Sequence, residues 1–237
     1  MTTFCGRRAL PRSFYVGDTV QIARALLGKV LIHETREGPC GGPIVETEAY
    51  LRDDPACHAV LRVRGADCWE ARMTPRNAPM FGPPGTAYVY RVYTNHLCFN
   101  IVTQPEGVPE AVLVRAIEPA EGVDLMRWRR GVESLKALTS GPAKLTQALA
   151  IGRSLSGADL GRGPLRVLDA PAVPDQDVVV TTRIGVRLAA ERPWRVYIAE
   201  SPYVSRKVTG PNKIGPPSRG RFSMARSRLC RDRHGGL

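Results

Sequence analysis

Three strand-like segments stand close together in the middle of the chain, and their spacing limits the possible folds more than any other feature. TAYVYRVY (86–93), HLCFNIVT (96–103) and EAVLVRAIE (110–118) are rich in the β-branched and aromatic residues that favour strands. Their connections have the length of hairpin loops, which join antiparallel neighbours. Thr94 and Asn95 form a natural two-residue link between the first pair, because asparagine tolerates a positive φ. These segments predict an antiparallel sheet at the centre of the fold.

Helices and further strands are predicted on both sides of this central group. A first helix is expected in GDTVQIARALLG (17–28), where Asp18 can cap the amino end and Gly28 can end it. The turn-rich segment 38–43 is expected to join two strands as a hairpin, and segment 51–84 is expected to be a long irregular loop of the kind that usually carries function. The other predicted strands are 29–34, 44–50, 177–186 and 194–200, and the other predicted helices are 120–131 and 140–152.

The order of these elements indicates the fold class. Strands, inserted helices and strands again are typical of a single α+β domain with a largely antiparallel sheet flanked by helices. We expect this domain to cover residues 1–209, followed at 210–237 by a basic tail that is poor in packable residues and disordered. The apolar runs fall short of the roughly 20 residues that span a bilayer, and no apolar stretch follows the positively charged amino terminus. We therefore expect no membrane contact and no secretion signal.

The charge balance points to a class of partner. The formal net charge is +12 and the isoelectric point is about 9.9. Such an excess favours a polyanion, because each neutralised phosphate releases condensed counterions, although an arginine-rich composition can also reflect a GC-rich genome. The six cysteines form no CxxC pair, and the four histidines form neither HxxxH nor HExxH, which argues against a metal site and a disulfide scaffold. A reducing compartment is expected, either the cytoplasm of a bacterium or the nucleus of a eukaryote.

The segment IVETEAY (44–50) places two glutamates and a tyrosine at alternate positions of a predicted strand. Side chains alternate between the two faces of a strand, so Glu46, Glu48 and Tyr50 are expected on one face. A glutamate beside a tyrosine can serve as a general base when its surroundings tune its pKa and a water lies in reach. Two solvated glutamates on an exposed face are the simpler alternative. The alternation locates an acidic face without choosing between its members.

Arginine, histidine and tyrosine side chains in other segments offer further chemistry. Arg115 lies among apolar residues in AVLVRAI, where it needs a buried acidic partner, and one of the two glutamates can fill that role. His58 can act as an acid or base, donate a hydrogen bond to a ligand or make an ordinary polar contact. Tyr88, Tyr90 and Tyr93 lie on a strand or at its end. Tyrosines there usually pack, but near a basic surface they can also stack on bases.

Taken together, these stretches resemble the alkyladenine (3-methyladenine) DNA glycosylase family, the mammalian-type enzymes that remove alkylated purines. The matching segments occur in the family's order and at nearly its spacing, and they span roughly residues 10 to 205. They are ARALLGKVL, IVETEAY, His58, MTPRNAPMF, PGTAYVYRVY, CFNIV, VLVRAIEPAEG, SGPAKLTQALAI and SPYVS. The resemblance implies a curved sheet with a protruding β-hairpin, a monomer, and double-stranded DNA containing damaged purines as the partner.

The resemblance also implies which residues handle the base. Such enzymes take the target base out of the duplex. The family's tyrosine that enters through the minor groove and fills the vacated space matches Tyr93. The flipped base lies between aromatic side chains that match Tyr50, with His58, on one side and Tyr90 on the other, and aromatic faces suit a cationic alkylated purine. Leu113 matches a residue that lines the pocket.

The family's general base is the second glutamate of the ETEAY run, which matches Glu48. It would deprotonate or orient the water that attacks the sugar C1′, with Arg115 helping to hold that water, and its charge would favour the oxocarbenium-like sugar. Asn100 matches an asparagine that meets the 2-amino group of normal guanine and so discriminates against it. No lysine or other amine stands at the position of the general base. The resemblance therefore implies a monofunctional glycosylase, without cofactor or metal, that leaves an abasic site in base excision repair.

The implied substrates are alkylated or deaminated purines, the class of 3-methyladenine, 7-methylguanine, hypoxanthine and ethenoadenine. Thr74, Arg76 and Lys144 are candidates for contacts with DNA phosphates. Three features depart from the family pattern. The hairpin turn carries Thr94-Asn95 in place of the usual Gly-Met, and the loop from Val60 to Arg72 has no clear counterpart. The segment between Tyr50 and His58 is a residue shorter than in some members of the family.

Three other functions stay open at this point. A non-catalytic protein could use the same wedge and pocket to recognise damage, although the presence of both Glu48 and Arg115 weighs against it. The charge and the tyrosines also fit a protein that binds RNA or single strands, but no motif of that kind is recognised. A small-molecule hydrolase built on Glu46 and Glu48 is favoured only if the positive charge is incidental.

Overall fold

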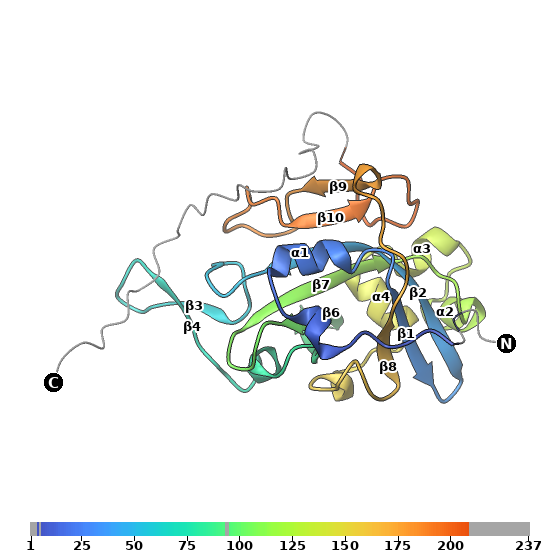
Figure 1. Cartoon of the computed structure of the whole chain (residues 1–237), viewed down its shortest axis with the longest axis horizontal. Coiled ribbons are helices and arrows are strands. Elements are labelled where there is room, and N and C mark those ends of the chain that lie inside the picture. The colour runs from blue at the N-terminus through green and yellow to red at the C-terminus, as the bar shows by residue number, and fades with distance from the viewer. Residues whose placement is uncertain (1–3, 5, 93–94, 209–237) are drawn as a thin grey trace.

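The fold is built on one antiparallel sheet, which Figure 1 shows as a curled layer. The computed structural model describes residue 4 and residues 6–92 and 95–208. The strands of the sheet in this part of the chain are β1 (Val30–Thr35), β2 (Gly38–Tyr50), β5 (Ala87–Val92), β6 (His96–Thr103), β7 (Glu110–Ile117), β8 (Leu165–Leu168), β9 (Val178–Thr181) and β10 (Arg195–Ile198). Their order is β5-β6-β7-β2-β1-β8, and β10 joins β9 to β2. The predicted α+β fold with a largely antiparallel sheet is confirmed.

The helices in the described part of the chain are α1 (Thr19–Ala25), α2 (Val123–Arg130), α3 (Leu135–Thr139) and α4 (Pro142–Ala148), with 3-10 turns η1 (Arg12–Tyr15), η2 (Ala78–Phe81), η3 (Arg153–Leu155) and η4 (Asp175–Asp177). Of these, α1, α2 and α4 lie within predicted segments and pack on strands, whereas α3 packs on α4. Asp18 caps α1 by accepting hydrogen bonds from the backbone N–H groups of Val20 and Gln21, at 2.8 and 2.9 Å. Pro142 stands in the first turn of α4, where its missing N–H is tolerated. The first of these helices packs on β2 and β7, and α4 packs on β6 and β7.

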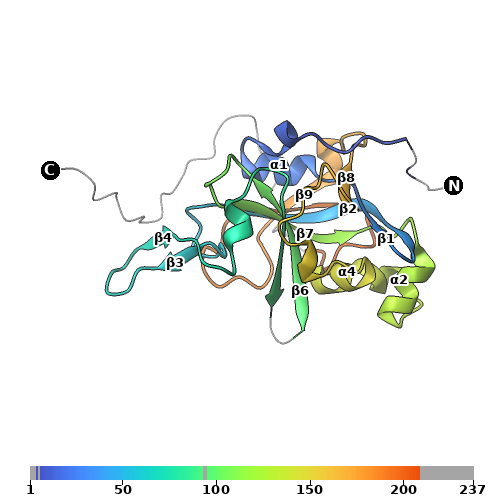
Figure 2. The ribbon, with the colours of Figure 1, turned by 90° about the horizontal axis from the view of Figure 1, so that it is seen from below.

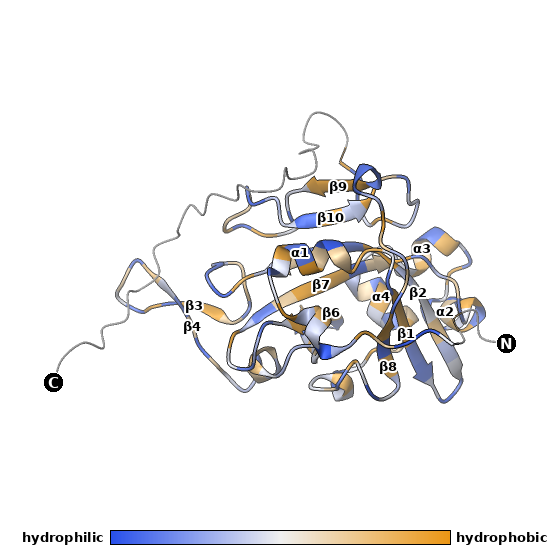
Figure 3. Ribbon diagram, in the orientation of Figure 1, coloured by the Kyte–Doolittle hydropathy of each residue, from blue (hydrophilic) through white to orange (hydrophobic). Residues whose placement is uncertain are grey.

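The two faces of the central strands belong to different clusters of buried side chains. Val112 and Val114 of β7 lie in the main hydrophobic core with helix residues such as Leu145. Ala111, on the other face, lies in a second cluster that includes Tyr88. A strand covered on both faces is apolar throughout, and β7 is hydrophobic along most of its length in Figure 3. The core and helices thus occupy one face of the sheet, which leaves the other face for the site described below.

Two hairpins project from the body in different directions (Figure 2). The first is formed by β5 and β6, where the family resemblance implies a protruding hairpin. Its predicted wedge residue, Tyr93, and Thr94 of its turn lie outside the described residues. Because β5 and β6 pair from Ala87↔Ile101 to Val92↔His96, the hairpin remains regular up to the edge of this turn.

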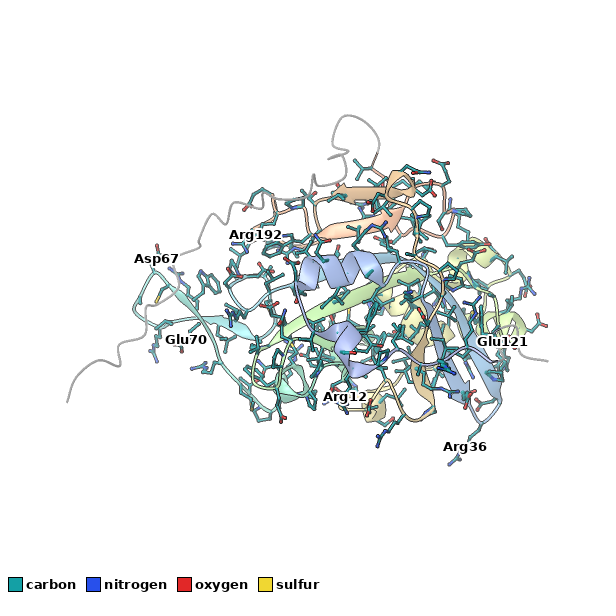
Figure 4. The ribbon with its side chains drawn as sticks, in the orientation of Figure 1. Arg12, Arg36, Asp67, Glu70, Glu121 and Arg192 are labelled. Atoms are coloured by element: carbon teal, nitrogen blue, oxygen red, sulfur yellow. The ribbon has the colours of Figure 1, made fainter. Side chains whose placement is uncertain are left out.

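The second projection is a two-stranded ribbon of β3 (Val60–Arg62) and β4 (Trp69–Ala71), which pair with each other and with no strand of the main sheet among the described residues. Figure 4 shows Asp67 and Glu70 on its outer part. The prediction that 51–84 is irregular throughout is therefore wrong for this ribbon. Its strands are three residues long, too short to show a periodic pattern.

The turn-rich segment 38–43 is not a turn but the first part of β2. It pairs with β1 from Thr35↔Gly38 to Val30↔Pro43. The glycines serve close packing: a Cβ on Gly41 would lie 2.1 Å from the carbonyl oxygen of Leu31, and one on Gly42 would lie 1.8 Å from that of Glu118. Glycine in a strand often marks such a close backbone approach, so composition alone misplaces the hairpin turn.

The remaining differences concern short elements. The sequence predicts neither α3 nor β8, and β9 is shorter than the predicted strand 177–186. No helix in the described part of the chain is long and apolar enough to cross a membrane. The predicted tail at 210–237 lies outside the described residues.

Candidate active site

One row of cross-strand neighbours crosses five strands of the sheet. From β5 to β10 it consists of Tyr88, Asn100, Leu113, Glu48 and Arg195, each in register with the next. Directly opposed residues of antiparallel strands have their Cβ atoms about 4.5–5.5 Å apart on one face. The register therefore assembles residues that are far apart in sequence, including three that the sequence predicts for the site.

Glu48 is fully buried within this row. Its carboxylate accepts hydrogen bonds from the Tyr50 hydroxyl at 2.9 Å and from the backbone N–H of Ile184 at 2.7 Å, and it pairs with Nη1 of Arg115 at 3.2 Å. A carboxylate offers about four acceptor positions. The three donors that the described residues supply leave one position for a further ligand.

Glu46 is also fully buried, and it has more hydrogen-bond donors around it than Glu48. It accepts hydrogen bonds from Nε of Arg115 at 3.0 Å and Nε of Arg195 at 2.7 Å. Ser205 adds its backbone N–H at 2.7 Å and its hydroxyl at 2.9 Å. The expectation of two solvated glutamates is therefore wrong, because ion pairs compensate the burial of both carboxylates. Glu46 holds two arginines, whereas Glu48 contacts only Arg115 of the two.

Arg115 bridges both glutamates, where the sequence predicts one partner. The pairing of β2 with β7 shifts between Glu46 and Thr47, opposite Arg115, and this irregularity lets both carboxylates reach the one guanidinium. Burial lowers the pKa of Arg115, but Glu48 and Glu46 raise it by more, so the pKa lies above its ordinary value. The guanidinium is therefore a fixed positive charge beside Glu48.

An aromatic pocket lies next to this charged network. It encloses about 30 Å³, which is room for a water molecule or two. Of the predicted base-binding residues, Tyr50, His58, Tyr90 and Asn100 line it, whereas Leu113 is buried beside them in the row. The lining is completed by Ala56, Met80, Tyr88 and Ala111. Alternation along the strand predicts that Tyr88 shares the strand face of Tyr90. The sequence gives no signal for a site role of Ala56, Met80 or Ala111.

His58 is held against the tyrosines of β5. Its ring stacks on Tyr90 with 4.4 Å between ring centroids, and Nδ1 hydrogen-bonds with the hydroxyl of Tyr88. Burial, and then the charge of Arg76, lower the pKa of His58 to about 4. The imidazole is therefore neutral at neutral pH and contributes a flat polar ring without charge.

The predicted phosphate contacts lie at different places. Arg76 is exposed and donates from Nη2 to the carbonyl of Arg91 at 2.6 Å, which ties its loop to the β5–β6 hairpin. Thr74 is half-buried, and its backbone N–H is donated to Asn77 at 2.6 Å. Lys144 is exposed on α4. The structure brings Arg76 to the pocket, while Lys144 stays on the helix that packs against β6.

Other hollows lack this chemistry. Two of them, of about 350 and 640 Å³, border α4 and are lined by none of the predicted site residues. They are larger than the aromatic pocket, but size without a reactive group does not make a catalytic site. Among the described residues there is no group of three or more His, Cys, Asp or Glu side chains that could hold a metal ion.

Comparison with known proteins settles the family. The model of the methylpurine-DNA glycosylase family matches residues 13–202. The chain belongs to the methylpurine-DNA glycosylase family. It is 50% identical to a protein of Methanoculleus marisnigri over 84% of this chain and 99% of the relative, and 48% identical to one of Carboxydothermus hydrogenoformans over the same shares. A Salinibacter ruber relative is 46% identical over 83% of this chain and 96% of its own length.

All three relatives carry the name "Putative 3-methyladenine DNA glycosylase". The match to the methylpurine-DNA glycosylase family covers the whole charged network up to Arg195 and every residue of the aromatic pocket. It ends before Ser205, which completes the set of donors around Glu46. The match is to the family as a whole and does not assign the chain to a mammalian-type branch.

Proposed function

We propose that the protein is a monofunctional DNA glycosylase that removes alkylated or deaminated purines from double-stranded DNA and leaves an abasic site for base excision repair. The observation that carries this proposal is the buried Glu48–Arg115 pair, 3.2 Å apart, which the hydroxyl of Tyr50 joins to an aromatic pocket in a methylpurine-DNA glycosylase chain. The names of the relatives support the same activity.

The pocket suits a flat base that has left the helix. Tyr50, His58 and Tyr90 all line it, and π faces attract an electron-poor or cationic ring. The expected grouping of His58 with Tyr50 is wrong, because the His58 ring stacks on Tyr90. Because the enclosed space of about 30 Å³ is smaller than a purine, these rings separate when the base enters. Extrusion of the base costs a few kcal/mol and is easiest for a damaged pair. Stacking in the pocket offsets that cost.

Glu48 activates the water. The water accepts a hydrogen bond from Arg115 and donates to the acceptor position that Glu48 retains, so its oxygen is held for attack on the sugar C1′. As the glycosidic bond breaks, its electron pair leaves with the purine, and Glu48 takes the proton of the water. The negative charge of Glu48 stabilises the oxocarbenium-like sugar. A cationic purine leaves as a neutral base, whereas a neutral purine must gain a proton as it leaves.

The other predicted residues complete the proposal. Tyr93 fills the space left by the flipped nucleotide. The amide of Asn100 donates to the carbonyl of Tyr88 at 3.2 Å, and in this proposal Asn100 discriminates against a normal guanine by meeting its 2-amino group. Arg76, Thr74 and Lys144 contact phosphates. The enzyme acts as a monomer and needs no cofactor.

The deciding experiment is to incubate the purified protein with duplexes that carry hypoxanthine, ethenoadenine or 7-methylguanine and to measure free base. The expected result is release of base without added metal, with strand breaks only after alkali. Tight duplex binding without release would instead indicate a protein that only recognises damage. Strand cleavage without heat or alkali would contradict the monofunctional chemistry.

A further inference from the structure

An arginine stands behind the aromatic wall of the pocket. The guanidinium of Arg183, in the loop after β9, lies over the ring of Tyr50, with 4.6 Å between Cζ and the ring centroid. The Arg183 side chain is fully buried and is not among the residues that line the pocket. Tyr50 therefore has a fixed cation against its ring and is itself part of the pocket lining.

The position of this cation is fixed by several contacts. Asp54 forms two hydrogen bonds to it, one of them from Nη2 at 3.1 Å, and the Asp54 side chain is also fully buried. Nη1 donates to the carbonyl of Ala49 at 3.1 Å, and the guanidinium also lies 5.0 Å from the ring centroid of Trp194. The Nε of Arg183 is buried without a hydrogen-bond partner among the described residues, but the contacts of Nη1 and Nη2 hold the guanidinium in place.

The loop that carries Arg183 also reaches the general base. The next residue, Ile184, donates its backbone N–H to Glu48 at 2.7 Å. Burial lowers the pKa of Arg183 and Asp54 raises it by more, so the group stays charged throughout the physiological range. One loop thus supplies both a donor to the catalytic carboxylate and a permanent charge behind the base-binding ring.

We propose that the Arg183–Asp54 pair sets the preference of the pocket between cationic and neutral damaged purines. This inference rests on the proposed glycosylase function. The face of an aromatic ring attracts a cation through its quadrupole. A positive charge already held against Tyr50 repels a second one stacked on the pocket side, and Asp54 cancels part of that repulsion. Arg183 is thus a positioning and specificity residue that acts through Tyr50 and touches no substrate.

Substitutions at the pair separate charge from structure. Arg183→Gln removes the cation and keeps a hydrogen-bond donor, whereas Asp54→Asn leaves the cation without its counter-charge. The rates of release of 7-methylguanine, which is cationic in DNA, and hypoxanthine, which is neutral, are measured in single turnovers on the same preparation. Their ratio does not depend on the fraction of folded enzyme. We expect the ratio to rise about two- to fivefold in Arg183→Gln, as cation–π energies of about 0.5–1 kcal/mol imply, and to fall in Asp54→Asn.

Two further variants serve as controls. Arg183→Lys keeps the charge and should restore the wild-type ratio. Arg129→Gln removes another arginine whose side chain is largely buried, which pairs with Glu37 at 3.0 Å and does not line the pocket, and it should leave the ratio unchanged.

The possible failures can be told apart. Release of both bases by the wild type, with a ratio that is unchanged in Arg183→Gln or that moves in the same direction in both pair variants, would overturn the inference alone. A wild-type protein that released neither base would overturn the proposed function and this inference with it.

Discussion

Glu46 and Glu48 are both buried and both contact Arg115, but they differ in the number of donors around them. The carboxylate of Glu46 accepts four hydrogen bonds, whereas that of Glu48 accepts two and forms an ion pair with Arg115. Alternation along IVETEAY predicts the shared face and cannot predict this difference. Ser205 and Ile184 donate their backbone N–H groups to the glutamates from distant loops. Every residue except proline has such a group, so the sequence gives no sign of which residue donates.

Charge removal at these two positions should have opposite consequences. We expect Glu48→Gln to reduce single-turnover base release by at least about 10²-fold, the usual contribution of a general base, while duplex binding changes only a few-fold. Glu46→Gln should keep release within about tenfold of wild type but lower the free energy of unfolding by about 3 kcal/mol, because two buried arginines lose their shared counter-charge. Base-release assays and urea unfolding measure both effects. A reversal of the two outcomes would mean that water binds at Glu46.

His58 should make the stability of the protein depend on pH. Its pKa falls from an ordinary value of 6.5 to about 4 in the folded protein, so as the pH falls the unfolded chain takes up the proton first. The contribution of His58 is therefore complete above about pH 6.5 and is lost between about 6.5 and about 4. Urea unfolding at pH 7, 5.5 and 4.5 should show a smaller loss in His58→Gln than in wild type. The matched variant His96→Gln, at an exposed position, should retain the wild-type loss.

Secondary structure was predictable where local chemistry determines it. The central strands, α1 with its Asp18 cap and α4 with Pro142 in its first turn all lie where the sequence indicates. Segment 38–43 was predicted wrongly from its composition, because its glycines allow a close approach of neighbouring backbone and do not form a turn. Only the position of the facing carbonyl oxygens distinguishes the two uses, and that is a property of the folded sheet.

The cap of α1 gives a prediction for this element. Asp18→Ala removes two hydrogen bonds to helix N–H groups and should lower the free energy of unfolding by about 1 kcal/mol. Near the other end of this helix, the hydroxyl of Thr47 donates to the carbonyl of Ala23 at 2.8 Å. Thr47 is the neighbour of Glu48 on β2. Because this contact lies beyond the cap, base release by the folded variant should equal that of wild type. Asp18→Asn, which can still cap, should recover most of the stability, whereas equal losses in both variants would assign the effect to charge.

In the molecule as a whole, the buried charges of the proposed active site are separate from the charges at the surface. The Glu46, Glu48 and Arg115 network is buried within the sheet, while charged residues such as Arg12, Arg36 and Glu121 stand at the surface (Figure 4). Surface charges act through counterion release and are screened by salt, whereas buried pairs are screened much less. Substrate binding and chemistry should therefore respond differently to ionic strength.

The segment 210–237 provides the test of this separation. It carries seven basic residues and one acidic residue, which is half of the net charge of +12. A variant that ends at residue 209 should bind undamaged duplex about tenfold more weakly at low salt, and the logarithm of its affinity should fall less steeply with the logarithm of salt concentration. Its single-turnover base release at saturating enzyme should match wild type, because the described contacts of Glu48 and Arg115 all lie within residues 46–205. A full-length variant with the seven basic residues replaced by glutamine should behave like the truncation, since the charge and not the length of the segment supplies the binding. Loss of base release in the truncation but not in the glutamine variant would show that the segment is part of the catalytic domain.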